Sequence, residues 1–259
     1  MTNKTLGFIG GGRVVRILLE GFRAKNIEFP EIVVTETNEE ALARLREIFP
    51  GISAQTQDNR APASCDIVFL ALHPPACPAA LDGIKETLKP DSVLVSLAPK
   101  LTMARLTEKL GGFERLVRMI PNAPSIIGRG FNPLAFSNAF ADDEKRSLAD
   151  IFAALGDCPE VPETALEAYA VIAAMGPTYF WFQWRELGRL AESFGLAPEE
   201  SALALKKMLG GSIQAYFESG LTPEQVMDLV PVKPLGEDEE SIRNIYRSKL
   251  ETLFQKLKA

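Results

Sequence analysis

The stretch LGFIGGGRVV, residues 6–15, decides the fold, because a short apolar run leads into three consecutive glycines and then into a helical pattern. A strand, glycine turn and helix in this order form the unit on which dinucleotides place their pyrophosphate. The helix N-terminus there offers free N–H groups and the positive end of its dipole. Gly10 permits the tight turn, and Gly12 leaves the backbone uncovered for the phosphates. The residues expected to bind the cofactor here are Gly10, Gly11, Gly12, Arg13 and Val14.

A second apolar run, residues 31–35, is followed directly by Glu36, at the distance from the glycines where dinucleotide-binding folds carry an acidic residue. Its carboxylate is expected to accept hydrogen bonds from the adenosine ribose and to repel a 2′-phosphate. The sequence therefore favours NAD over NADP. Arg13 keeps NADP open as the alternative, because a guanidinium binds phosphate well.

Apolar strands and helical patterns alternate along the first part of the chain and then give way to helices alone. Nearly continuous apolar strands between helices indicate a parallel sheet that is covered on both faces. The sequence predicts an α/β Rossmann-type doubly wound parallel sheet in residues 1–161 and an all-α domain in residues 162–259. Further strands are expected at residues 66–72, 92–98 and 115–119, and the helices of the second domain at about 163–194, 198–219 and 238–257.

Composition narrows the function classes. The 259 residues carry a formal net charge of −6, so no basic surplus exists for nucleic acid or an anionic membrane. The N-terminus lacks a signal-peptide pattern, and no apolar stretch approaches the roughly 18 residues that span a bilayer. Three cysteines without CxxC spacing and one histidine predict reduced, mostly buried thiols and no metal site. We expect a cytoplasmic protein that acts on a small molecule.

Three later segments resemble the pyrroline-5-carboxylate reductase family, which catalyses the last step of proline synthesis. VRMIPNAPSIIGRG, residues 117–130, resembles its R-x-M-P-N-T-P-A-x-x-G-x-G signature, and FLALHPP, residues 69–75, resembles its strand ending in A-V-K-P. MGPTYFWFQWRELGRLAESFGLAPEESALAL, residues 175–205, resembles its S-G-P-A-Y helix and the stretch beyond. The resemblance covers nearly the whole chain.

This resemblance implies a Rossmann domain followed by a helical domain that forms a homodimer. It also implies hydride transfer from a nicotinamide to the C=N bond of a small cyclic imine, chemistry in which the cofactor supplies the reactive atom. By the same analogy, one loop lines the cofactor and another lies near the nicotinamide. The residues concerned are Leu70, Ala71, His73 and Pro74 in the first loop, and Pro121 and Asn122 in the second.

The chain departs from the family pattern where the substrate would be held. AAMGP, residues 173–177, replaces a Ser-Gly-Ser-Gly-Pro run. PVKPLGEDEE, residues 231–240, replaces a T-S-P-G-G-T-T loop that supplies donors to the substrate carboxylate. His73 replaces a lysine, and Ala98-Pro99-Lys100 replaces an Ala-Ala-Gly turn. Removing donors from a site that holds a carboxylate is expected to cost specificity.

The sequence leaves the catalytic residue unidentified and offers three candidates, His73, Asn122 and Lys100. His73 is either a cofactor contact, a proton donor to the imine nitrogen, or a polar loop residue. Lys100 either replaces the missing carboxylate donors or is a solvated loop cation. Asn122, between two prolines, either holds the substrate or the nicotinamide carboxamide or shapes a structural turn.

Two other functions stay open. The altered substrate loop also fits a catalytically silent or regulatory NAD(P)-binding protein of the same fold. A β-hydroxyacid-type dehydrogenase shares the two-domain plan, but it needs a lysine in the first long helix of the second domain. Residues 163–200 contain no lysine, which argues against that alternative.

Overall fold

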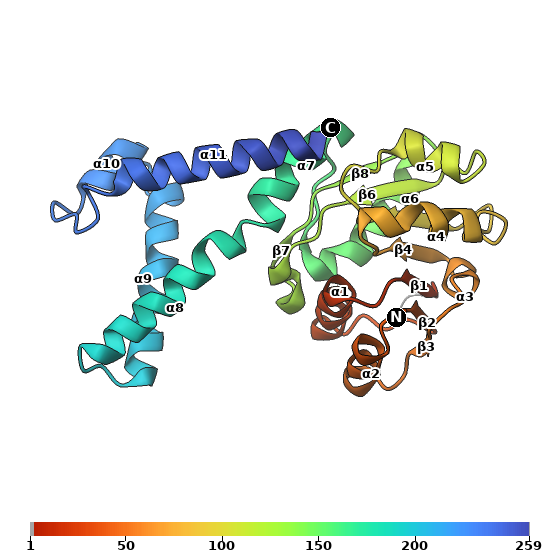
Figure 1. Cartoon of the computed structure of the whole chain (residues 1–259), viewed down its shortest axis with the longest axis horizontal. Coiled ribbons are helices and arrows are strands. Elements are labelled where there is room, and N and C mark those ends of the chain that lie inside the picture. Colours follow the sequence, from red (N-terminus) through yellow and green to blue (C-terminus); the bar gives the residue numbers. More distant parts are fainter. Residues whose placement is uncertain (1–2, 259) are drawn as a thin grey trace. The chain divides into compact units, whose positions relative to one another are not determined.

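The computed structural model describes residues 3–258 and divides into two compact units (Figure 1). The first unit comprises Met1–Met175 together with Leu253–Ala259, and the second comprises Gly176–Thr252. The first unit therefore extends beyond the boundary that the sequence placed at residue 161.

The first unit is built on a seven-stranded sheet in the order β3-β2-β1-β4-β5-β6-β8. The strands from β3 to β6 are parallel, which confirms the predicted Rossmann-type sheet. The edge strand β8 is antiparallel to β6, a correction to the all-parallel prediction. The link from β6 to β8 holds a 3₁₀ turn rather than a crossover helix, so the chain returns in the opposite direction. The strands are β1 (Leu6–Ile9), β2 (Ile32–Thr35), β3 (Ser53–Gln55), β4 (Ile67–Leu70), β5 (Val93–Ser96), β6 (Leu116–Met119) and β8 (Leu134–Phe136).

Helices cover both faces of this sheet, and local signals set several of their ends. The side chain of Asn38 accepts the N–H of Ala41 at 2.9 Å, and that of Thr102 accepts the N–H of Arg105 at 3.3 Å, so both residues cap the helices that follow them. The helices are α1 (Arg13–Ala24), α2 (Glu39–Ile48), α3 (Arg60–Ala63), α4 (Cys77–Ile84), α5 (Met103–Lys109) and α6 (Asp142–Phe152). Shorter elements are η1 (Pro74–Ala76), η2 (Ala123–Ile127), β7 (Gly130–Phe131), η3 (Ala153–Leu155) and β9 (Gly156–Asp157).

The two faces of the sheet bury separate apolar cores, as the two-residue period of a strand requires. In β4, Phe69 packs into the core beneath α1, α2 and α6, while Val68 and Leu70 pack into the core beneath α3, α4 and α5. Phe8 of β1 stacks on Phe69, with ring centroids 4.9 Å apart. Both layers hold the central strands rigid, and those strands end where the glycine loop begins.

The three thiols are free. Cys65 and Cys77 are buried and Cys158 is half-buried, and burial raises the pKa of each to about 11. Thiols with such a high pKa carry almost no reactive thiolate at neutral pH. The expectation of unpaired, mostly buried cysteines is therefore confirmed.

The segment after residue 162 is interrupted, whereas the sequence suggested one long helix at 163–194. It contains η4 (Glu163–Ala165), α7 (Leu166–Tyr169) and the π-helix η5 (Ala170–Ala174), all in the first unit. A new helix, α8, begins at Pro177. Proline has no N–H to continue the preceding helix but is well suited to a first turn, which explains the break.

The second unit consists of helices. It contains α8 (Pro177–Ser193), α9 (Pro198–Glu218), the unpredicted short helix α10 (Pro223–Asp228) and α11 (Glu239–Lys258) as far as Thr252. Ser201 of α9 is buried, and its hydroxyl donates to the carbonyl of Gly188 in α8 at 3.3 Å. No helix within residues 3–258 is both long and apolar enough to span a membrane.

Candidate dinucleotide site

The carboxyl ends of four neighbouring strands lie level at one edge of the sheet. Leu70 of β4 pairs with Ile9 of β1 on one side and with Ser96 of β5 on the other, and Ser96 pairs with Arg118 of β6. The chain order reverses between β1 and β4, and open α/β sheets bind ligands at such a point. The loops after these strands carry the sequence-predicted site residues, so the fold brings them to one edge.

Two of the three loop glycines are required by the fold itself. Gly10 has a φ of +101°, and a Cβ there would lie 2.5 Å from the carbonyl oxygen of Ala71. A Cβ on Gly11 would lie 2.8 Å from the Cβ of Glu36. Because both contacts involve atoms that cannot easily move, Gly10 and Gly11 let β1, β2 and β4 end close together.

Gly12 differs, because nothing in the fold demands a glycine there. Its φ of −74° suits any residue, and a Cβ would meet no atom within 4 Å. The backbone N–H groups of Gly12, Arg13 and Val14 donate to no acceptor within residues 3–258. Free donors at the start of the twelve-residue helix α1, beside open space, form the cradle that an anionic pyrophosphate needs.

Glu36 ties the glycine loop to the end of β2. One carboxylate oxygen accepts the N–H of Gly11 at 2.8 Å, and the other accepts the N–H of Asn38 at 2.8 Å. The oxygen that accepts from Asn38 also accepts the Thr37 hydroxyl at 3.4 Å, while the oxygen bound to Gly11 can accept a further hydrogen bond, so Glu36 remains able to bind a ribose hydroxyl. The sequence indicated the ribose contact but not the anchoring of Gly11, which no spacing rule reveals.

The residues in and next to the loop after β4 differ in their exposure to solvent. Ala71 lies against Gly10, and His73 and Pro74 are exposed, Pro74 being the first residue of η1. The side chain of Leu70 is fully buried in the core, and its carbonyl accepts the N–H of Leu97. The side chain of Leu70 therefore supports the sheet, and the predicted cofactor contact of this residue would involve its backbone.

Asn122, which follows Pro121 after β6, has its amide fixed by the backbone. Its Oδ1 accepts the N–H of Phe131 at 3.0 Å, so the orientation of the amide is set and its NH₂ group is left to donate. Its own N–H donates at 3.1 Å to Asn132, which is fully buried and also accepts the hydroxyl of Ser125. Asn132 was not predicted, although an asparagine between apolar residues is a recognisable signal.

The sequence also missed a buried ion network below this edge. Arg118, in the middle of β6, is 1% exposed and donates to Glu163 at 3.0 Å and to Glu167 at 2.7 Å. A charge inside an apolar strand needs a buried partner, and Glu163 and Glu167 follow at helical spacing. This network joins η4 and α7 to the sheet, which explains why the first unit continues past residue 161.

The same carboxylates hold the backbone after β5. Glu163 accepts the N–H of Met103 at 2.7 Å, and Glu167 accepts the N–H of Lys100 at 3.4 Å. Lys100 is half-buried and has a φ of +70°. The structure therefore places Lys100 at the end of β5, between the strand that leads to His73 and the strand that leads to Asn122.

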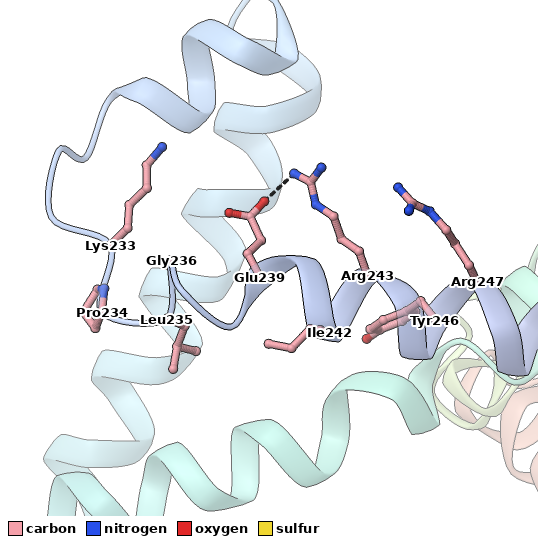
Figure 2. A pocket seen from close by; sticks show the side chains of 9 residues that line it. All are labelled: Lys233, Pro234, Leu235, Gly236, Glu239, Ile242, Arg243, Tyr246 and Arg247. Carbon is pink, nitrogen blue, oxygen red and sulfur yellow. Dashed lines mark hydrogen bonds and ion pairs between the residues drawn. The ribbon is translucent and has the colours of Figure 1, made fainter.

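The altered loop at residues 231–240 lies in the second unit and lines a cavity of about 690 Å³ with the start of α11. Figure 2 shows Glu239, Arg243 and Arg247 projecting from one side of α11, with Ile242 and Tyr246 on another. Glu239 forms an ion pair with Arg243. The loop therefore presents charged and apolar side chains where the sequence comparison expected hydroxyls. Elsewhere in the described chain, no group of three or more histidine, cysteine or acidic side chains is arranged to hold a metal ion.

Comparisons with known proteins agree with a dinucleotide-binding fold in the first unit. Residues 5–100 match the family model described as NADP oxidoreductase coenzyme F420-dependent. Together with the glycine cradle and the level strand ends, this match defines an NAD(P)-dependent oxidoreductase with a Rossmann-type domain.

Whole-chain relatives are more specific. The chain is 26% identical to the pyrroline-5-carboxylate reductase of Corynebacterium melassecola, over 96% of this chain and 93% of that protein. It is 28% identical to the solved pyrroline-5-carboxylate reductase of Coxiella burnetii, with a TM-score of 0.70 over 99% of this chain and 95% of that one. The chain is thus similar to pyrroline-5-carboxylate reductases over nearly its whole length. The NADP-bound enzyme of Plasmodium falciparum, 23% identical, shares the fold with a TM-score of 0.84 over 100% of this chain and 98% of that one.

Proposed function

We propose that the protein reduces the C=N bond of a small cyclic imine, with pyrroline-5-carboxylate as the first substrate to test. The observation that carries the proposal is the loop at Gly12. Its free N–H groups and the open space beside them suit a pyrophosphate, and the fold itself does not require a glycine at this position. When bound, a reduced nicotinamide supplies the hydride. The chain's own residues bind and orient the two molecules. The fixed amide of Asn122 is a donor to the substrate or to the carboxamide, and exposed His73 is the candidate source of the proton.

Turnover is the direct test. Purified protein with NADH or NADPH and pyrroline-5-carboxylate is expected to oxidise the cofactor with a kcat of roughly 1–100 per second, within the usual range of enzymes. The measurement is the loss of reduced-cofactor absorbance, with proline quantified as the product. Tight cofactor binding without turnover, across a panel of cyclic imines, would instead favour the regulatory alternative.

We propose that the protein prefers NAD to NADP as its cofactor. Replacing Glu36 by alanine is expected to raise the affinity for NADP relative to NAD by roughly tenfold, because a negative charge beside the 2′-phosphate is removed. Titrations of both reduced cofactors, followed by fluorescence, measure the ratio.

Glu36→Gln is the matched control for that change, because glutamine keeps an acceptor for the N–H of Gly11 but carries no charge. If charge sets the preference, the Gln and Ala variants shift the ratio alike. If only Ala has an effect, anchoring of the glycine loop is responsible. A wild-type protein that already prefers NADP contradicts this role for Glu36.

The helical unit is proposed to form a homodimer. Within the chain, α8 buries none of its side chains, and Phe180, Trp181 and Phe182 are 45%, 46% and 66% exposed. Contiguous aromatic exposure of this kind is rare on monomers, and a second copy of the helical unit is the partner we propose. Light scattering on the eluted protein should give the mass of two chains, and a mass of one chain would exclude this assembly.

The three unpaired thiols fit the reducing cytoplasm.

A further inference from the structure

Lys100 occupies a backbone conformation that suits glycine. Its φ of +70° lies in the left-handed region, where a side chain destabilises the fold because Cβ approaches the following carbonyl oxygen. Within residues 3–258, the other side-chain-bearing residue with a positive φ is Asn26, and asparagine tolerates this region. Strain of this kind persists where surrounding structure enforces it, and it concentrates at functional sites. The presence of lysine rather than glycine at position 100 therefore indicates a role for the lysine side chain.

The backbone of Lys100 is hydrogen-bonded to the buried ion network. The N–H of Lys100 donates to Glu167, and the same carboxylate oxygen accepts Nη2 of Arg118, which is 1% exposed. Arg118 in turn belongs to β6, which pairs with β5. These contacts tie the backbone of Lys100 to the protein interior. We therefore expect this backbone to have the same position with and without a ligand.

The ammonium group of Lys100 remains available. It forms no ion pair with any carboxylate in the described part of the chain, whereas Arg118, a nearby cation inside β6, is paired with two glutamates. Lys100 also lies four residues beyond Ser96, whose neighbouring strands lead to His73 and to Asn122. A half-buried, unpaired cation at this edge is suited to bind an anion.

We propose that Lys100 binds the carboxylate of the substrate and so restricts the site to small amino and imino acids; this rests on the proposed function. The charge-assisted hydrogen bond from the ammonium orients the ring beside the nicotinamide position. A glycine at residue 100 would relieve the backbone but would leave the carboxylate without this donor. The competing role is structural: Lys100 would balance the negative charge of Glu163 and Glu167 and would contribute stability.

The test measures binding and stability on the same variants. L-Proline and L-prolinamide, which differ by the carboxylate, are titrated calorimetrically into the NAD-loaded protein. Wild type is expected to bind L-proline at least tenfold more tightly than L-prolinamide, and Lys100→Gly is expected to reduce this preference to about twofold or less. Its affinity for NADH should not change. Its Tm should stay the same or rise by up to about 3 °C, because the strain is released.

Two further variants separate the explanations. Lys100→Arg keeps a cation and should retain most of the preference for L-proline. Asn26→Gly makes a matched backbone change away from the site and should leave both ligands' affinities unaltered. The proposal is overturned if wild type does not distinguish the two ligands, if Lys100→Gly keeps the preference, or if its Tm falls by several degrees as the structural role requires. Failure to turn over pyrroline-5-carboxylate tests the proposed function separately, because these titrations need no catalysis.

Discussion

Replacing Arg118 by methionine is expected to lower the free energy of unfolding by about 3–5 kcal/mol, the usual cost of removing one partner from a buried ion pair. The change leaves the carboxylate of Glu167, whose side chain is 11% exposed, without its guanidinium. It also removes the contact to Glu163, which holds the N–H of Met103. Urea denaturation at neutral pH, followed by circular dichroism, measures the loss.

The control for this variant is Arg105→Met, which removes an exposed arginine on α5 and should change the free energy of unfolding by no more than about 0.5 kcal/mol. A double variant, Arg118→Met with Glu167→Met, should recover at least half of the loss, because the uncompensated charge is gone. An Arg118→Met protein as stable as wild type would show that the network contributes nothing to the fold.

Replacing Gly12 by valine is expected to weaken cofactor binding roughly 100-fold or more while leaving the protein folded, because each lost factor of ten corresponds to about 1.4 kcal/mol of binding free energy. The fold has room for the Cβ of this side chain, since a Cβ at Gly12 meets nothing within 4 Å, and the φ of −74° is ordinary. The added methyl groups would occupy the space beside the free N–H groups that the pyrophosphate needs. Fluorescence titration with NADH, together with a melting curve, separates binding from folding.

Gly83→Val provides the matched control. Gly83 lies near the C-terminal end of α4 with equally open space around its Cβ position, and it belongs to none of the loops assigned to the site. This variant should bind NADH as wild type does. If Gly12→Val binds the cofactor normally, the pyrophosphate does not sit at this turn, and the assignment of the site fails.

Sequence reasoning succeeded where a signal is local. The glycine loop and the parallel strands each depend on a few adjacent residues, and the structure shows both. It failed for short elements such as β8, whose three residues carry too little pattern, and for α10, whose start at Pro223 resembled a linker.

Features that depend on distant partners were out of reach. Arg118 meets glutamates 45 and 49 residues away along the chain, so a single-sequence reading sees only an isolated charge in a strand. Likewise, the left-handed backbone of Lys100 and its hydrogen bond to the distant Glu167 cannot be read from the local sequence. The sequence did single out Lys100, because it follows a predicted strand and because the related family has glycine at that turn.

The division of the chain has a consequence for how the molecule is made. The polypeptide leaves the first unit at Met175 and re-enters it at Leu253, and Leu257 near its end is buried. During synthesis, domains generally fold from the N-terminus as they emerge, but this unit receives its last residues only after all of Gly176–Thr252 has been translated. The first unit therefore completes its packing only by closing a loop that contains all of Gly176–Thr252, and closing so long a loop slows that step of folding.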